Sequence, residues 1–197
     1  MANTIVFYDT EFTSWKGAVQ NNWSEPGQYR EIVQIGALRF DLDTLETGAE
    51  FLILIKPRKN PVLSDYFIDL TGINNEAVAR EGLDFAEGWQ RFDAFLSGAV
   101  SACYGGDDFV MRENFGFNGM PDGPETFSSF NIGPWFKEEG ARFGVEPTTN
   151  SGALAKSVGV EMEMDTIQEH NALHDARSIA AAYRFMVQNG VEGPFSG

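Results

Sequence analysis

Two carboxylates near the start of the chain, Asp9 and Glu11, are separated by one residue and follow an apolar stretch at 5–8. Side chains alternate along a strand, so both acids point to the same face if this stretch is a strand. The stretch is apolar on both faces, which is typical of a central strand covered on both sides. Acids at the end of a buried strand are costly unless positive charge meets them, and oxygen ligands suit Mg²⁺ or Mn²⁺. A metal site therefore requires further ligands downstream.

Both histidines of the chain lie beside another acid, in the segment His170–Asp175. Asn171 is expected to cap the N-terminus of the last helix, which places Asp175 in its first turn. A carboxylate there gains from the helix dipole and can reach a metal. His170 would precede the helix on a loop, where it is free to face a substrate. A lone histidine near a helix start is usually a cap or a surface residue, but the clustering favours a functional role.

A fourth acid follows the strand predicted at 100–104, where Gly105 and Gly106 let the backbone turn closely. Asp107 and Asp108 compete for this role, and one of them could simply cap the helix that is predicted to begin at 109. We assign the role to Asp108. The neighbouring Cys103 is the chain's single cysteine, which excludes an internal disulfide and a cysteine-based zinc site.

Four carboxylates and one histidine suit phosphodiester hydrolysis with two divalent metal ions, Mg²⁺ or Mn²⁺. An imidazole titrates near neutral pH, so it suits the removal of a proton from the attacking water. These candidate catalytic residues are Asp9, Glu11, Asp108, His170 and Asp175.

The length of 197 residues and an apolar fraction of 43% suit one domain with its own core. We expect this domain to span 1–190 and a C-terminal tail to span 191–197. No apolar run is long enough to cross a membrane, and no signal pattern precedes the first strand. We therefore expect a cytoplasmic protein with no membrane partner.

The net charge of −15 argues against long-range attraction to duplex DNA or to anionic membranes. It does not exclude nucleic acid at a local cleft in which metal ions supply the positive charge.

Hydrophobic patterning predicts an α/β fold, a mixed sheet with helices on both faces. The first three strands form an antiparallel meander. The first expected strand ends in 7–12. The other four span 31–40, 50–56, 100–104 and 127–132. The expected helices span 74–80, 84–96, 109–115, 133–143, 151–158 and a stretch from about 171 to 190. Such folds place their sites at the carboxyl ends of central strands.

Two segments between the predicted strands left alternatives open. Residues 13–30 form a long loop in which Trp15 and Trp23 either stack on a base or pack the loop down. The basic cluster at 56–59 either guides a nucleic-acid strand or forms a solvated turn, and we favour the turn.

From residue 7 to about 186, the chain resembles DEDDh-type 3′→5′ exonucleases of the RNase H-like fold. The resemblance rests on three motifs: Asp9-Thr10-Glu11-Phe12, Gly105-Gly106-Asp107-Asp108, and the H-x₄-D spacing of His170 and Asp175. The related DEDDy class has a tyrosine four residues before the last acid, where this chain has Asn171. The resemblance implies a five-stranded sheet of three antiparallel and two parallel strands, flanked by helices.

Segments 30–36 and 63–73 resemble the group that trims the 3′ ends of structured and small RNAs, which includes histone-mRNA end exonucleases. This implies that Asp9, Glu11, Asp108 and Asp175 hold two metal ions and that His170 is the general base. The residues implied to contact the terminal nucleotide are Phe12, Thr13, Thr71, Gly72 and Ile73. The group usually has an aromatic residue before the catalytic acid of the second motif, and this departure keeps Asp107 open as an alternative.

The leading hypothesis is a metal-dependent 3′→5′ exonuclease that acts on single-stranded 3′ ends, favours RNA and releases nucleoside 5′-monophosphates. A proofreading or repair DNA exonuclease is the first alternative, because the same five residues serve both. A catalytically silent interaction module on the same fold is the second alternative. The sequence leaves the oligomeric state open.

Overall fold

The molecule is organised around a five-stranded sheet with the strand order β3-β2-β1-β4-β5. The structure, a computed structural model, describes residues 3–120, 123–125, 127–146, 148–162 and 170–195. The strands are β1 (Thr4–Phe12), β2 (Ile32–Asp41), β3 (Glu46–Leu54), β4 (Val100–Cys103) and β5 (Ser129–Asn131). The first three strands pair antiparallel, and β4 runs parallel to both β1 and β5. The predicted mixed α/β sheet is therefore confirmed.

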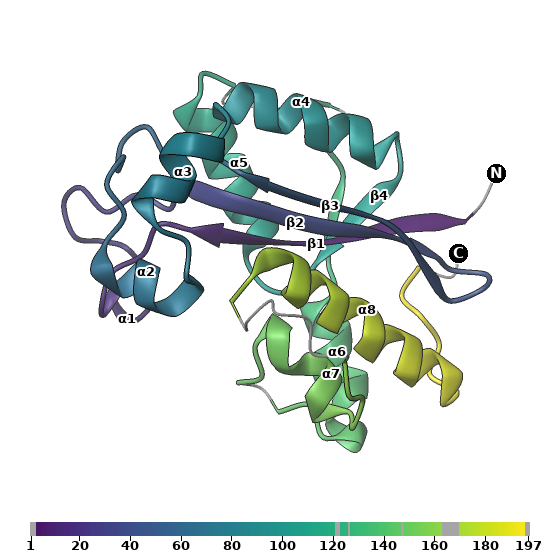
Figure 1. Ribbon diagram of the computed structural model, residues 1–197. Helices are drawn as coiled ribbons and strands as arrows, with labels where there is room; N and C mark the ends of the chain where they lie inside the picture. Colours follow the sequence, from purple (N-terminus) through teal and green to yellow (C-terminus); the bar gives the residue numbers. More distant parts are fainter. Residues whose placement is uncertain (1–2, 121–122, 126, 147, 163–169, 196–197) are drawn as a thin grey trace.

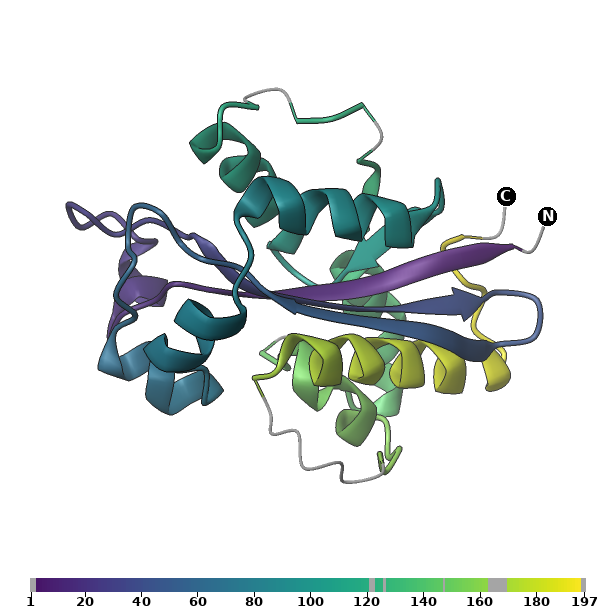
Figure 2. The same cartoon turned by 45° about the horizontal axis from the view of Figure 1, so that its top comes forward.

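Helices cover both faces of this sheet (Figure 1). Helices α4 and α5 lie on one face, and α6, α7 and α8 lie on the other, as Figure 2 also shows. The short helices α1, α2 and α3 gather at the end of the sheet towards which β1 points. The helices are α1 (Ala18–Asn21), α2 (Asp65–Thr71), α3 (Asn75–Glu81), α4 (Phe85–Leu96), α5 (Asp107–Phe117), α6 (Gly133–Glu139), α7 (Leu154–Ser157) and α8 (Ala172–Gln188), with 3₁₀ turns at Gly140–Phe143 and Ser151–Ala153.

Alternation along β1 sends its side chains into two separate core layers. Ile5 and Phe7 pack in the layer that contains α8, whereas Val6 and Tyr8 pack in the layer that contains α4 and α5. Because the period of a strand is two, the next acids, Asp9 and Glu11, continue on the α8 side. The buried central strand thus carries its carboxylates directly towards the last helix.

Several elements differ from the sequence-based expectation. Helix α1 interrupts the expected loop at 13–30, α2 was not expected, and β3 begins at Glu46 instead of residue 50. Helix α5 begins at Asp107, two residues before the predicted start. Cys103 is fully buried. Among the helices that the structure describes, none combines the length and apolar character needed to span a bilayer.

The described part of the expected C-terminal tail, residues 191–195, packs against the core. Val191 is buried, and the ring centroid of Phe195 lies 5.6 Å from that of Tyr183 and 6.3 Å from that of Phe7. Aromatic contacts of this kind stabilise a packed segment. Val191 and Phe195 therefore contact the core.

Candidate active site

Three buried carboxylates, those of Asp9, Glu11 and Asp175, converge where β1 meets α8. One oxygen from each lies within 4.8 Å of the others. The exposed fractions of these residues are only 5%, 9% and 5%. Burial, followed by the charges of neighbouring acids, raises the pKa of both Asp9 and Glu11 well above the usual values. Without a cation, the three carboxylates disfavour one another's ionised forms. A hard divalent cation prefers such a cluster of oxygen ligands.

The end of β1 is shaped to present these acids. Asp9 pairs with Gly36 and Glu11 pairs with Gln34 on β2, and the register then shifts between Glu11 and Phe12. A bulge of this kind re-aims side chains and is frequent next to active sites. The acids therefore extend from a rigid central strand at the point where regular pairing ends.

Two residues of β2 seat the N-terminus of α8 against the sheet. The side-chain oxygen of Gln34 accepts a hydrogen bond from the Ala172 backbone N–H at 2.9 Å. A Cβ atom at Gly36 would lie 2.1 Å from the Leu173 backbone nitrogen, so only glycine permits this approach. As predicted, Asn171 caps the helix, because its side chain accepts a hydrogen bond from the Leu173 N–H. Together these contacts place Asp175 in the first turn of α8.

The 3₁₀ turn at Ser151–Ala153 supports the carboxylates from the other side. The Ser151 hydroxyl donates to Asp175 Oδ2 at 3.0 Å, and Ser151 also opposes the rise in the pKa of Asp9. A Cβ atom at Gly152 would lie 2.5 Å from Asp175 Oδ1, so a larger residue would push this carboxylate away. Ser151 therefore links two carboxylates from different elements.

A cavity of about 220 Å³ opens above this cluster. Its lining residues come from β1, the β4–α5 junction, the 3₁₀ turn and the approach to α8. They are Asp9, Thr10, Glu11, Phe12, Tyr104, Gly106, Asp107, Asn150, Ser151, His170 and Asp175. Tyr104, Asn150 and Ser151 were not predicted, because no motif in the sequence marks them. Only the fold brings them to the acids.

The structure brings Asp107, and not Asp108, to the cavity. Asp107 Oδ1 accepts hydrogen bonds from the Thr10 backbone N–H at 3.0 Å and from the Thr10 hydroxyl at 2.6 Å. Burial raises the pKa of Asp107 to about 6, although the Thr10 hydrogen bonds oppose this shift. Asp108, which the sequence analysis placed in the site, is only partly buried and lies outside the lining. Successive helical side chains diverge by about 100°, so only one of the two acids can face β1.

His170 lines the same cavity and is partly buried. Its backbone φ of 66° lies in the left-handed region, where non-glycine residues are uncommon. Such backbone conformations cluster at functional sites. His174, in contrast, belongs to the first turn of α8 and is absent from the cavity lining.

The residues expected to contact a terminal nucleotide do not all lie in one cavity. Phe12 lines the acidic cavity. Gly72 and Ile73 instead line a neighbouring cavity of about 470 Å³, together with Gln34. The two threonines, Thr13 and Thr71, are buried, and their hydroxyls hydrogen-bond backbone groups.

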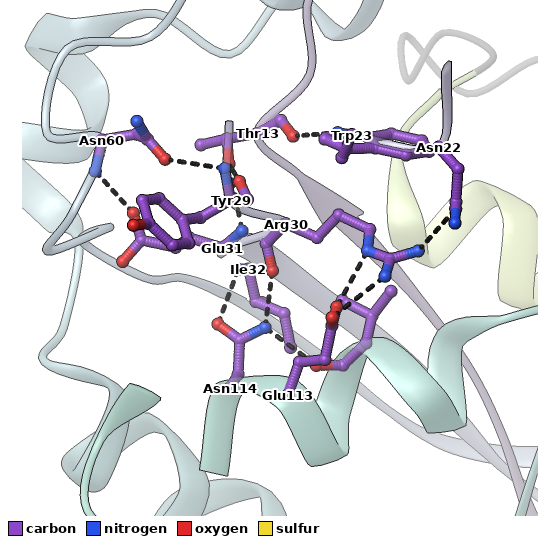
Figure 3. A network of polar contacts seen from close by, with 11 residues as sticks. Thr13, Asn22, Trp23, Tyr29, Arg30, Glu31, Ile32, Asn60, Glu113 and Asn114 are labelled. Carbon is purple, nitrogen blue, oxygen red and sulfur yellow. Dashed lines mark hydrogen bonds and ion pairs between the residues drawn. The ribbon is translucent and has the colours of Figure 1, made fainter. Parts of the chain in front are cut away.

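The loop that follows β1 is held by a polar network (Figure 3). The buried carboxylate of Glu31 accepts hydrogen bonds from the backbone N–H groups of Arg58, Lys59 and Asn60. The Asn114 side chain accepts from the Ile32 N–H and donates to the Arg30 carbonyl. The backbone of the basic cluster at 56–59 is thus fixed by Glu31.

For this loop, the sequence left open whether its tryptophans stack on a base or pack the loop down, and the structure shows how Trp23 packs. Its indole N–H donates to the Thr13 carbonyl at 3.0 Å, and its ring centroid lies 5.5 Å from that of Phe12. Trp23 therefore packs the loop against the end of β1.

This mixed sheet, with buried carboxylates below an open cavity at the end of its central strand, is the architecture of a nuclease domain. The exonuclease family model RNase_T matches residues 6–183 of the chain. The chain belongs to this exonuclease family.

Comparison with individual proteins agrees with this assignment. The chain is 30% identical to ERI1 exoribonuclease 2 of Xenopus laevis over 74 residues, which are 38% of this chain and only 10% of that protein. A 3′-exonuclease solved with a histone mRNA stem-loop superimposes with a TM-score of 0.77 at 21% identity, over 96% of this chain and 83% of that one.

Two further structures share the fold. The nuclease domain of 3′hExo, a DEDDh family member bound to rAMP, gives a TM-score of 0.75 at 21% identity, over 96% of this chain and 94% of that one. E. coli Exonuclease I in complex with a dA16 oligonucleotide gives a TM-score of 0.68 at 19% identity, over 94% of this chain and 41% of that one. The expected likeness to DEDDh exonucleases is thus confirmed for family and fold.

Proposed function

We propose that this chain hydrolyses phosphodiester bonds from the 3′ end of single-stranded nucleic acid and releases nucleoside 5′-monophosphates. The observation that carries the proposal is the cluster of Asp9, Glu11 and Asp175 at the base of an open cavity. Among the residues that line this cavity in the described ranges, none is a lysine or an arginine. The site therefore lacks its own permanent positive charge for a phosphate.

Asp9, Glu11 and Asp175 would hold divalent ions, with Asp107 in place of Asp108 as the fourth carboxylate. When bound, Mg²⁺ or Mn²⁺ supplies positive charge and Lewis acidity for the attack of water on phosphorus. We propose two such ions, because two-metal sites suit in-line displacement at phosphate. Ser151 and Thr10 fix the carboxylates through their hydroxyls.

His170 would act as the general base that takes a proton from the attacking water. Its place in the lining and outside the helix supports this role. His170→Ala is expected to lower the rate about 10²–10⁴-fold, the usual contribution of a general base. His174→Ala is the matched control, and an equal loss there would contradict the assignment.

We propose RNA as the favoured substrate, supported by the exoribonuclease relative and the structure solved with histone mRNA. A DNA exonuclease is the second candidate, supported by the fold shared with Exonuclease I bound to a deoxyoligonucleotide. The cytoplasmic location and the domain limits at 1–190 stay predictions.

The test uses matched single-stranded RNA and DNA, labelled at the 5′ end, with Mg²⁺, Mn²⁺ or EDTA. A ladder that shortens from the 3′ end only with metal, and faster on RNA, is expected. A faster DNA ladder would favour the second candidate. Degradation of neither strand would indicate the catalytically silent module.

A further inference from the structure

Trp23, Arg30 and Phe109 form a stacked group beside the active-site cavity, and we call it the stacking shelf. The guanidinium carbon of Arg30 lies 5.4 Å from the Trp23 ring centroid and 4.8 Å from that of Phe109. Figure 3 shows Trp23 and Arg30 reaching towards each other from the loop after β1. Phe109 is 52% exposed, although large aromatic side chains are usually well buried. The shelf therefore ends in an open aromatic ring.

The shelf is continuous with the cavity through its Trp23 end. Phe12 lines the cavity and stacks against Trp23 at 5.5 Å between ring centroids. Phe109 stands two residues after Asp107 in the first turn of α5, so its side chain lies on another side of the helix and the shelf extends outward from the cavity. A strand whose 3′ end occupies the cavity therefore has the shelf beside it as it leaves.

The shelf is held rigidly and carries little net charge. The Trp23 indole N–H donates to the Thr13 carbonyl. Two nitrogens of Arg30 donate to the Glu113 carboxylate at 2.8 and 2.9 Å, which neutralises the guanidinium. Phosphate groups are attracted by net positive charge, whereas bases stack on aromatic rings and on guanidinium planes. The geometry therefore suits bases better than phosphates.

We propose that the stacking shelf, with Phe109 at its open end, binds bases of a single-stranded nucleic acid upstream of the 3′-terminal nucleotide. This inference rests on the proposed function. It explains how a chain with a net charge of −15 retains a polyanion, since stacking needs no basic field. Every base has a flat face, so the shelf tolerates any sequence.

The experiment compares hydrolysis of a six-nucleotide strand with hydrolysis of an aryl ester of a nucleoside 5′-monophosphate, which has no upstream base. Phe109→Ala is expected to lower kcat/KM for the longer strand about 5- to 150-fold relative to the aryl ester. Phe109→Trp should preserve the preference for the longer strand. Phe130→Ala is the matched control, because Phe130 is 39% exposed and lies on β5.

A scan with single abasic nucleotides assigns the contact to a base. In the unmodified protein, one upstream abasic position should reduce kcat/KM, and Phe109→Ala should remove this sensitivity. Equal losses on both substrates, or an abasic effect that survives Phe109→Ala, would overturn the stacking shelf.

Fluorescence anisotropy of the labelled six-nucleotide strand provides a readout that needs no hydrolysis. The weakening of binding by Phe109→Ala should be the same at low and at high salt, because no phosphate contact is lost. Binding that depends on Phe109 without any hydrolysis would contradict the proposed function and support the shelf. If Phe109→Ala changes neither hydrolysis nor binding, the shelf is contradicted but the proposed function is not.

Discussion

At the scale of single residues, the site is a set of acids whose burial works against their own ionisation. Asp9 and Glu11 have raised pKa values because burial and neighbouring acids disfavour their charged forms. The Ser151 hydroxyl opposes this rise in the pKa of Asp9 but does not outweigh burial. The same arrangement that prepares the site for cations therefore lowers the stability of the protein without them.

Which of the two neighbouring acids serves the site is testable by comparing Asp107→Asn with Asp108→Asn. Asp107 faces the cavity and accepts two hydrogen bonds from Thr10, whereas Asp108 lies outside the lining. We expect Asp107→Asn to lower kcat/KM about 10²–10³-fold, the scale of losing one preorganised electrostatic group. Asp108→Asn should retain most activity. A reversed order, measured on the same labelled strand, would restore the sequence-based assignment to Asp108.

The raised pKa of Asp107 also predicts how the stability of the metal-free protein depends on pH. Its pKa is raised from 3.8 to about 6 in the folded chain. Between these values the folded state holds more protons than the unfolded state, so the free energy of unfolding falls as pH rises. Urea titrations in EDTA from about pH 4 to 6 should show this fall, and Asp107→Asn should reduce its slope. A slope that is unchanged in the variant would contradict the raised pKa.

The sequence singled out the acids because their types and spacing are chemically restrictive. It could not choose between Asp107 and Asp108, because both follow the same two glycines. The choice depends on how α5 docks against Thr10, which involves residues 97 positions apart. Ser151 was not predicted for the same reason, since a lone serine near a predicted helix start carries no distinguishing signal.

At the scale of elements, the most restrictive contact is that between β2 and the start of α8. The strands with strong apolar patterns were predicted well, and so was the Asn171 cap of α8. The first half of β3 was missed because its exposed, polar residues are held by pairing with β2 and not by burial. Helix α2 was missed although Ser64 caps it and Gly72 ends it, since seven residues give little periodicity.

Gly36→Ala tests the close approach of β2 and α8. The added methyl would lie 2.1 Å from the Leu173 backbone nitrogen, so α8 has to shift and carry Asp175 with it. We expect thermal unfolding to show a loss of about 1–3 kcal/mol, the usual cost of overpacking, together with reduced hydrolysis. Gly116→Ala is the control, because nothing lies within 4 Å of its added methyl. It should be neutral or slightly stabilising within α5. Similar losses in both variants would contradict the close-approach account.

At the scale of the whole molecule, a chain with a net charge of −15 has to hold a substrate that is itself negative. Long-range attraction cannot supply this binding, so it has to come from local groups near the cavity. The cavity's acids would do so through divalent ions, and the stacking shelf would do so through the bases. The family assignment and the position of the acids support the first of these two roles.

The most direct test of the account compares the chain with its Asp175→Asn variant on one 5′-labelled single strand, with Mg²⁺ or with EDTA. Circular dichroism first establishes that the two proteins share the same fold. We predict that the original chain shortens the strand from its 3′ end only with Mg²⁺, and that the variant leaves it intact in both conditions. Equal shortening by the variant, or shortening by the original chain in EDTA, would contradict a metal-dependent exonuclease site built on these carboxylates.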